Sequence, residues 1–237
     1  IVTGDSVDSP NMAAENSYRN FSEYIENRCG QRPLRILGNH DIDDHGLSLN
    51  KDKKQIINVT GNYPRIEILP IPKVILLLFN SNTDGNFAQE KIGNSQMSEM
   101  GNILDGVKNL SDYLLIAVLH HHIVPIPQPI FYDRKWYMNM VPKNFVEESL
   151  KLIDADLFTE WLKLRNVRIV IHGHKHIPFM TKFGGITVIS CGSSTGQISH
   201  KEKGKTYISY NLLRINNGVI TCTQFAEEIL GAGVKNL

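Results

Sequence analysis

The sequence predicts an α/β fold in which two β-sheets form a sandwich that helices flank. In the N-terminal and middle parts, apolar runs of strand length alternate with amphipathic helical segments, a pattern typical of parallel βαβ units. Near the C-terminus, strand-like runs follow one another, and Asn217-Gly218 marks a tight hairpin between the last two. Parallel units followed by antiparallel strands fit a two-sheet α/β sandwich.

The N-terminal residues predict one βαβ unit. Residues 1–4 and residues 34–37 are rich in strand-forming residues, and each run stops at polar residues. Between them, residues 11–28 predict a helix whose apolar residues share one face, namely Ala14, Tyr18, Phe21 and Ile25. We expect this helix to cover the sheet and the two strands to run parallel.

The middle of the chain predicts an antiparallel hairpin, a helix and a buried strand. Residues 66–69 and 73–79 are joined by a short connection, which favours the hairpin. Residues 95–108 predict a helix with Ser95 as its N-cap and with an apolar stripe that belongs to the core, formed by Met97, Met100, Ile103, Leu104 and Val107. Residues 113–119 follow as a strand.

Residues 123–145 are too long and too irregular for an ordinary connection, because they hold four prolines among aromatic and basic side chains. Two interpretations are open: a lid that contacts substrate, or a packed proline-rich loop. The position directly after the histidines at 120–122 favours the lid.

The C-terminal part predicts one more helix and four strands. Residues 147–164 predict an amphipathic helix that packs through Leu150, Ile153, Leu157, Trp161 and Leu164. The strands are expected at residues 168–171, 185–190, 206–215 and 219–225.

Four of the predicted strands end in residues that bind metals. The residues concerned are Asp5, the run Gly38-Asn39-His40-Asp41, His120-His121-His122 and Gly173-His174-Lys175-His176. Ligands of open α/β sheets gather beyond the carboxyl ends of the strands, so we expect these residues to share one rim. The i, i+2 spacing predicts that His174 and His176 lie on one side of an extended backbone. Mixed oxygen and nitrogen ligands suit Mn, Fe or Zn and do not suit calcium.

These motifs, in this order, resemble those of the calcineurin-like metallophosphoesterases. The resemblance rests on Gly4-Asp5-x-x-Asp8, Gly38-Asn39-His40-Asp41, His120 and Gly173-His174-x-His176. The stretch from His120-His121 through Val124-Pro125 is similar to the cyclic-nucleotide phosphodiesterase branch. The family normally opens with an Asp-x-His ahead of the Gly-Asp motif, and none precedes Gly4-Asp5 in this sequence; Asp43-Asp44-His45, which has this pattern, follows the Gly-Asn-His-Asp run. We therefore expect a single metallophosphoesterase domain of the αββα type over residues 1–237, without its first strand and helix.

The resemblance also implies roles for individual residues around two divalent metal ions. Asp5 would bridge both metals, and the second metal would be completed by Asn39, His120 and His174. His176 would reach the first metal, whose other family ligands belong to the absent motif, so residues 1–237 by themselves are expected to be weakly active or inactive. His40 would be the catalytic histidine, which stabilises the transition state or protonates the leaving oxygen. Asp8 and Asp41 would hold imidazoles in the right tautomer, and His121 would contact substrate or solvent.

The resemblance implies no role for His122 or for His172. His120 and His122 share a strand face that His121 opposes, so at most two of these three point at one site. His122 is left unassigned. His172 is expected to be a core histidine.

Composition narrows the class of partner. A net charge of +1 gives no broad basic field of the kind that marks general nucleic-acid binding. The three cysteines are widely spaced, which indicates neither a disulfide framework nor a zinc knuckle. No apolar run is long enough to span a membrane. We expect a small phosphorylated, nucleotide-like substrate, a cytoplasmic location and a surface compatible with an oligomer.

The sequence thus predicts a metal-dependent phosphoesterase that hydrolyses a phosphodiester, such as a cyclic nucleotide, by a metal-activated hydroxide. The rival enzymes are a phosphomonoesterase, a nucleotide or lipid pyrophosphatase, and a nuclease. A non-catalytic scaffold of the same fold is the alternative from another class. His40 beside a full set of second-metal ligands speaks against the scaffold, whereas the absent Asp-x-His keeps it open.

Overall fold

The structure, a computed structural model, describes residues 1–6, 12–42, 61–86, 89–125, 151–174, 176, 178–192, 197–198, 206–216 and 219–229. Its centre is a six-stranded sheet with the order β1-β2-β5-β6-β8-β7. The four inner strands are parallel, namely β2 (Val74–Leu78), β5 (Leu114–Val118), β6 (Ile169–His172) and β8 (Ile186–Ser190). The outer strands run antiparallel to their neighbours and are β1 (Arg65–Leu69) and β7 (Phe179–Phe183).

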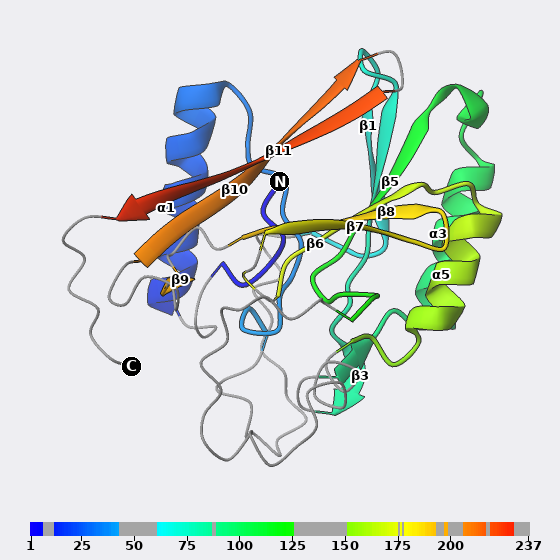
Figure 1. Cartoon of the computed structure of the whole chain (residues 1–237), viewed down its shortest axis with the longest axis horizontal. Helices are drawn as coiled ribbons and strands as arrows, with labels where there is room; N and C mark the ends of the chain where they lie inside the picture. Colours follow the sequence, from blue (N-terminus) through cyan, green and yellow to red (C-terminus); the bar gives the residue numbers. More distant parts are fainter. Residues whose placement is uncertain are drawn as a thin grey trace.

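A second sheet lies across the first. Its three antiparallel strands follow the order β11-β10-β9 and are β9 (Gln197–Ile198), β10 (Thr206–Asn216) and β11 (Val219–Ile229). Figure 1 shows β10 and β11 crossing in front of the six-stranded sheet. Leu213 and Ile215 of β10 and Ile220 of β11 pack against one buried face of β2, β5, β6 and β8. The predicted two-sheet sandwich is confirmed.

Helices flank the sandwich on both sides (Figure 1). Helices α3 (Asn94–Asp105) and α5 (Ala155–Leu164) pack on the other face of the six-stranded sheet, where Met100, Leu104, Phe158 and Leu162 are buried. The rings of Phe79 and Phe158 meet edge to face at 5.1 Å. Helix α1 (Met12–Cys29) lies on the opposite side of the molecule.

The N-terminal residues form the expected parallel pair. Val2 and Arg35 make a parallel bridge, in which the Val2 N–H donates to the carbonyl of Leu34 at 2.8 Å and the Ile36 N–H donates to that of Val2 at 3.1 Å. Helix α1 connects the two segments, and its Tyr18 ring lies 3.2 Å from the guanidinium of Arg35. The pairing is shorter than the predicted strands, but it brings the segments that follow, at Asp5 and Asn39, to the same edge.

The predicted helix over residues 147–164 is wrong in its start and in its buried face. Residues 151–154 form a bend and a turn, and α5 begins only at Ala155. Ile153, Leu157 and Leu164 are exposed, while the buried face consists of Ala155, Phe158, Thr159 and Leu162. The Asp154 carboxylate accepts the N–H groups of Ile92 and Gly93, which fixes the rotation of the helix. Both stripes have helical spacing, so periodicity did not distinguish them.

Other boundaries differ by a few residues. Helix α3 ends at Asp105 and has Gly93, not Ser95, at its N-cap position, although Met97, Met100 and Leu104 lie in the core as predicted. The sequence reading missed β7, β9 and the small hairpin of β3 (Thr83–Asn86) and β4 (Gln89–Lys91). The predicted lid lies mostly outside the described residues, which stop at residue 125 and resume at 151. None of the described helices has the length and apolar character that a membrane span needs.

Candidate metal centre

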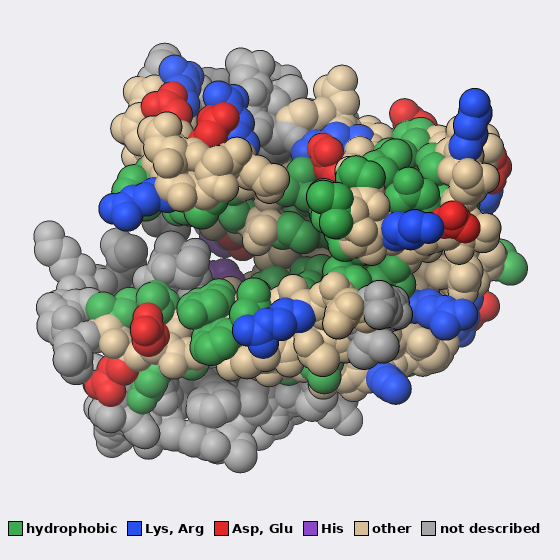
Figure 2. All heavy atoms as spheres, turned by 90° about the horizontal axis from the view of Figure 1, so that it is seen from above, with side chains coloured by type: hydrophobic (Ala, Val, Ile, Leu, Met, Phe, Trp, Pro, Cys, Tyr) green, Lys and Arg blue, Asp and Glu red, His purple; other side chains and the backbone are tan. Residues whose placement is uncertain are grey.

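The structure brings the four strand-end motifs together at one edge of the six-stranded sheet. His120 follows β5 and His174 follows β6, while Asp5 and Asn39 follow the two halves of the Val2–Arg35 bridge. Because β5 and β6 are parallel, their carboxyl ends lie at the same edge. Figure 2 shows histidine side chains at the bottom of a hollow in the surface.

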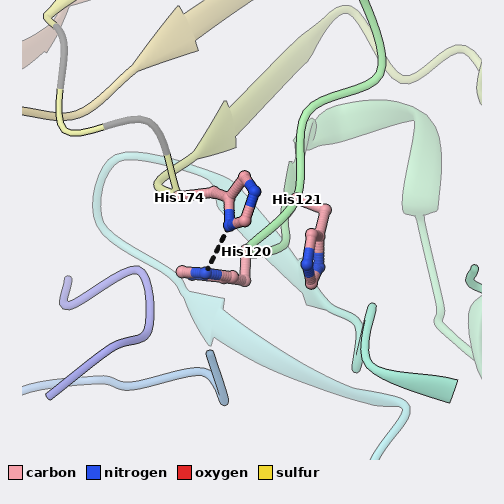
Figure 3. Close-up of side chains that lie close together, drawn as sticks. All are labelled: His120, His121 and His174. Atoms are coloured by element: carbon pink, nitrogen blue, oxygen red, sulfur yellow. Dashed lines mark hydrogen bonds between the residues drawn. The ribbon is translucent and has the colours of Figure 1, made fainter. Parts of the chain in front are cut away.

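Four ligand-type atoms lie around one point. Nε2 of His120 lies 2.9 Å from Oδ1 of Asn39 and 3.2 Å from Oδ2 of Asp5. Nδ1 of His174 lies 3.2 Å from the same Asn39 oxygen and 3.3 Å from Nε2 of His120. Figure 3 shows how the two imidazoles approach each other. The set combines a carboxylate, an amide oxygen and two imidazoles, which suits Mn, Fe or Zn.

The hydrogen bonds of His120 test whether this set fits a cation. Nδ1 of His120 lies 2.7 Å from the carbonyl oxygen of Thr3, which can only accept, so Nδ1 carries a hydrogen. In the neutral ring, the lone pair on Nε2 then faces the oxygens of Asp5 and Asn39. Electron-rich atoms that face one another at these distances require a positive charge between them, supplied by a proton or by a metal ion. The residues therefore fit a divalent metal.

The electrostatics of this buried pair favour positive charge. Burial alone would raise the pKa of Asp5, but His120, with His176 and His40, outweighs burial and holds that pKa far below its ordinary value. Burial opposes the charging of His120, yet the charge and hydrogen bond of Asp5 raise its pKa. By contrast, burial lowers the pKa of His121 and of His174 well below the ordinary value. Neutral imidazoles beside a carboxylate are the state that metal binding requires.

Glycines and Asp41 allow the strand ends to approach closely. A Cβ at Gly4 would collide with Nδ1 of His120, and one at Gly38 would collide with Asp5. The buried Asp41 carboxylate accepts the N–H of Ser6 at 2.9 Å and the N–H of Gly38 at 2.8 Å. Burial raises the pKa of Asp41. Asp41 thus ties together the two loops that carry Asp5 and Asn39, and its contact with an imidazole stays a prediction.

His40 lies at the exposed side of the centre. Its backbone N–H donates to Oδ1 of Asp5 at 3.1 Å, and its side chain is exposed. An exposed imidazole beside the carboxylate is accessible to a substrate. The companion residue Asp8 lies outside the described residues.

His174 and His176 are not on an extended backbone, and this part of the prediction is wrong. Strand β6 ends at His172, and both residues have positive φ, 70° for His174 and 57° for His176. The chain turns there, so the i, i+2 rule for strands does not apply. His176 still approaches the centre, with Nε2 4.0 Å from Oδ2 of Asp5.

The histidine run after β5 also departs from strand geometry. The strand ends at Val118, and His120, His121 and His174 each offer a ring nitrogen within 4.8 Å of the others. The expectation that His121 points away from the face of His120 is therefore wrong. His172 is fully buried, as expected of a core histidine, and burial lowers its pKa to about 4. His122 is buried too, with its ring 5.9 Å from that of His174.

Ser81 also lies at this centre, and the sequence analysis assigned no role to it. It follows β2, and its hydroxyl oxygen lies 3.0 Å from Nδ1 of His121. The position of Asn80-Ser81-Asn82 at the end of a predicted strand was the signal available in the sequence.

A carboxylate, an amide oxygen and two imidazoles that meet at the strand ends of a two-sheet sandwich can hold a metal ion. Residues 1–178 match the sequence profile of the calcineurin-like phosphoesterases. The match covers most of the chain and includes Asp5, Asn39, His120 and His174. The chain belongs to the calcineurin-like phosphoesterase family.

Similar proteins carry varied names. A protein of Psychrobacter arcticus named "Probable cyclic nucleotide phosphodiesterase" is 26% identical over 211 residues, which cover 87% of this chain and 67% of that protein. Among solved structures, the Plasmodium inner-membrane-complex anchor GAP50 matches with a TM-score of 0.49 and 13% identity, over 96% of this chain and 76% of that chain. The phosphopantetheinyl hydrolase of Mycobacterium tuberculosis matches with a TM-score of 0.47 and 11% identity, over 81% and 78%.

Proposed function

We propose that this protein is a dinuclear metal-dependent phosphoesterase that hydrolyses a phosphodiester, such as a cyclic nucleotide. The observation that carries the proposal is the cluster of Asp5, Asn39, His120 and His174, whose ligand-type atoms approach one another to 2.9–3.3 Å. When bound, two divalent ions supply Lewis acidity, which lowers the pKa of water and neutralises phosphoryl charge.

Within this proposal, the four clustered residues hold the second metal. Asp5 also faces the first metal, together with His176, whose Nε2 lies 4.0 Å from the same carboxylate oxygen. The Thr3 carbonyl fixes the His120 ring so that Nε2 presents its lone pair. The metals proposed are Mn, Fe or Zn, because the ligand set mixes oxygen and nitrogen.

His40 is proposed as the catalytic histidine. Its backbone is anchored on Asp5 while its ring is exposed, so it can meet a substrate oxygen above the buried ligands. The role is to stabilise charge in the transition state or to give a proton to the leaving oxygen. Asp41, and Asp8 outside the described residues, are proposed to position the loops and imidazoles around it.

The substrate class rests on two supports. One is the sequence from His120-His121 to Val124-Pro125, which resembles the cyclic-nucleotide phosphodiesterase branch. The other is the name of the Psychrobacter arcticus relative. A phosphomonoesterase, a nucleotide or lipid pyrophosphatase and a nuclease are the rival activities. The cytoplasmic location stays a prediction.

Substrate competition in a metal-reconstituted protein tests the proposal. The full-length protein, stripped of metal and reloaded with Mn²⁺, is expected to hydrolyse bis(p-nitrophenyl) phosphate faster than p-nitrophenyl phosphate. A panel of cyclic AMP, cyclic GMP, nucleotide pyrophosphates, lipid phosphodiesters and single-stranded nucleic acid then identifies the natural class. Tight binding of metal without hydrolysis of any of these would favour the non-catalytic scaffold.

A further inference from the structure

Ser81 makes an unusual set of contacts with the histidines that follow β5. Its hydroxyl oxygen lies 3.1 Å from the backbone nitrogen of His121 and 3.3 Å from that of His120. The same oxygen lies 3.0 Å from Nδ1 of His121. Both Ser81 and His121 are fully buried. A single hydroxyl therefore meets two backbone donors and one ring nitrogen.

The donor and acceptor capacity of the Ser81 hydroxyl determines which ring nitrogen of His121 carries the hydrogen. A serine hydroxyl has two lone pairs and one hydrogen. The two backbone N–H groups donate to the lone pairs, so the hydroxyl hydrogen is the one that bonds Nδ1 of His121. Nδ1 is therefore an acceptor, and the neutral ring carries its hydrogen on Nε2.

His120, the neighbouring histidine, is held in the opposite tautomer. His120 donates its Nδ1 hydrogen to the Thr3 carbonyl and leaves Nε2 bare. Two consecutive histidines at one centre thus present different chemistry, a lone pair from His120 and an N–H from His121. A protonated ring nitrogen cannot bind a metal ion, so geometry alone does not make His121 a ligand.

The Nε2–H of His121 has no acceptor among the described residues. Nε2 is buried, and no hydrogen-bond partner for it exists in the part of the chain that the structure describes. The ring lies beside the candidate centre, with its centroid 4.5 Å from that of His174 and 5.0 Å from that of His120 (Figure 3). A buried donor without an acceptor is costly, and such groups serve a ligand, an ion or water.

We propose that Ser81 holds His121 as a hydrogen-bond donor to a phosphoryl oxygen of the bound substrate. This inference rests on the proposed function, since it takes the anion at the centre to be a phosphoryl group. Ser81 acts as a positioning residue, because its contact is with His121 and not with the substrate. His121 then binds the anion beside the metals and is not a third imidazole ligand.

The tautomer is measured directly by NMR. Long-range ¹H–¹⁵N spectra of the full chain with ¹⁵N-labelled histidine distinguish a protonated from a bare ring nitrogen, and the variant His121→Gln assigns the signals. We expect a hydrogen on Nε2 and a bare Nδ1 in the metal-free protein and in the Zn²⁺-loaded protein. Ser81→Ala should give a mixture of both tautomers, while Ser95→Ala, at an exposed position of α3, should leave the spectrum of His121 unchanged. A hydrogen on Nδ1, or coupling of His121 to ¹¹³Cd²⁺ bound in place of zinc, would overturn the proposal.

Binding of inorganic phosphate to the Zn²⁺-loaded protein tests the donor role. His121→Ala should weaken phosphate binding by about 10- to 100-fold, the range for a hydrogen bond to a charged group. His121→Gln, whose amide N–H can replace Nε2–H, should recover part of that loss. Equal phosphate affinity in wild type and His121→Ala would refute the donor role. If Ser81→Ala does not fold, the wild-type tautomer still decides the matter.

The two measurements separate this inference from the proposed function. The predicted tautomer with phosphate-dependent shifts at His121, but without hydrolysis, would reject only the proposed activity. Hydrolysis by a protein whose His121 carries its hydrogen on Nδ1 would reject only the role of Ser81 and His121.

Discussion

The two sides of the candidate centre are built differently. On the buried side, the His120 side chain is 1% exposed, and its ring is held by the Thr3 carbonyl and faces Asn39. On the open side, the His176 side chain is 47% exposed and the His40 side chain is exposed as well. Asp5 lies between, in contact with both sides. The difference teaches that the buried side is suited to holding an ion in fixed geometry, whereas the open side is suited to exchanging a substrate.

Neutralising Asp5, whose carboxylate lies between the two sides of the centre, should have the largest effect on metal content and turnover. Asp5→Asn takes away the carboxylate that touches His120 and approaches His176, so we expect loss of bound metal and a fall in hydrolysis of more than about 10⁴-fold, beyond the usual effect of a general acid. Plasma mass spectrometry measures the metal, and a diesterase assay measures turnover. Asp156→Asn, the same change at an exposed site of α5, is the control. Full activity of Asp5→Asn would remove the dinuclear mechanism.

Replacement of His40 should lower turnover without loss of bound metal. His40→Ala is expected to lower turnover by about 10²- to 10⁴-fold, the typical contribution of general acid–base catalysis. Metal content should stay near that of wild type, because the ligand-type atoms on the buried side are unchanged. Metal analysis and kinetics on the same preparation check this. A variant that lost its metal would show that His40 is a ligand.

The pair His174→Ala and His176→Ala compares the two sides with the same substitution. His174 lies 3.2 Å from Asn39 within the buried cluster, whereas His176 lies 4.0 Å from Asp5 and is partly solvated. We expect His174→Ala to bind Zn²⁺ at least about tenfold more weakly than His176→Ala, because even an outer contact of a metal site is worth about 10- to 100-fold in affinity. Competition with a chromophoric chelator gives both affinities. Equal losses would contradict the division into a holding side and an open side.

The sequence allowed prediction of those features of the fold and the candidate site that local patterns of residues encode. The clustering of Asp5, Asn39, His120 and His174 could be predicted because apolar runs stop at residue types that can bind metal ions, and a parallel sheet places such strand ends at one edge. The sandwich was readable because the apolar strands and the Asn217-Gly218 turn are local signals.

The errors came from tertiary contacts that no local pattern encodes. The register of α5 depends on Asp154 binding the N–H groups of Ile92 and Gly93, which lie about 60 residues earlier in the chain. The directions of His121, His174 and His176 depend on backbone turns beyond the strands, with positive φ at the latter two. The role of Ser81 depends on the backbone of two residues that follow another strand.

The smallest expected effect is on the pH dependence of folding stability in the metal-free protein, and it concerns His172 on the buried side of the centre. His172 is fully buried and donates Nδ1–H to the Gly173 carbonyl at 3.0 Å, and burial lowers its pKa to about 4. Its folded pKa lies below the unfolded value of about 6.5, so its neutral state contributes stability above that value, and the contribution is lost as pH falls from about 6.5 to 4. Such a shift corresponds to about 3 kcal/mol in the free energy of unfolding.

We therefore expect His172→Leu to show a weaker pH dependence of stability than wild type. Urea unfolding of the metal-free chain at pH 7.5 and near pH 4 measures the two free energies, and their difference should be smaller in the variant by about 3 kcal/mol. The comparison uses the difference in the free energy of unfolding between the two pH values. A packing change caused by the leucine is the same at both pH values, so it cancels in this difference. An unchanged pH dependence in His172→Leu would mean that water or a proton reaches this ring, and the buried side would then be no better shielded than the side of His40.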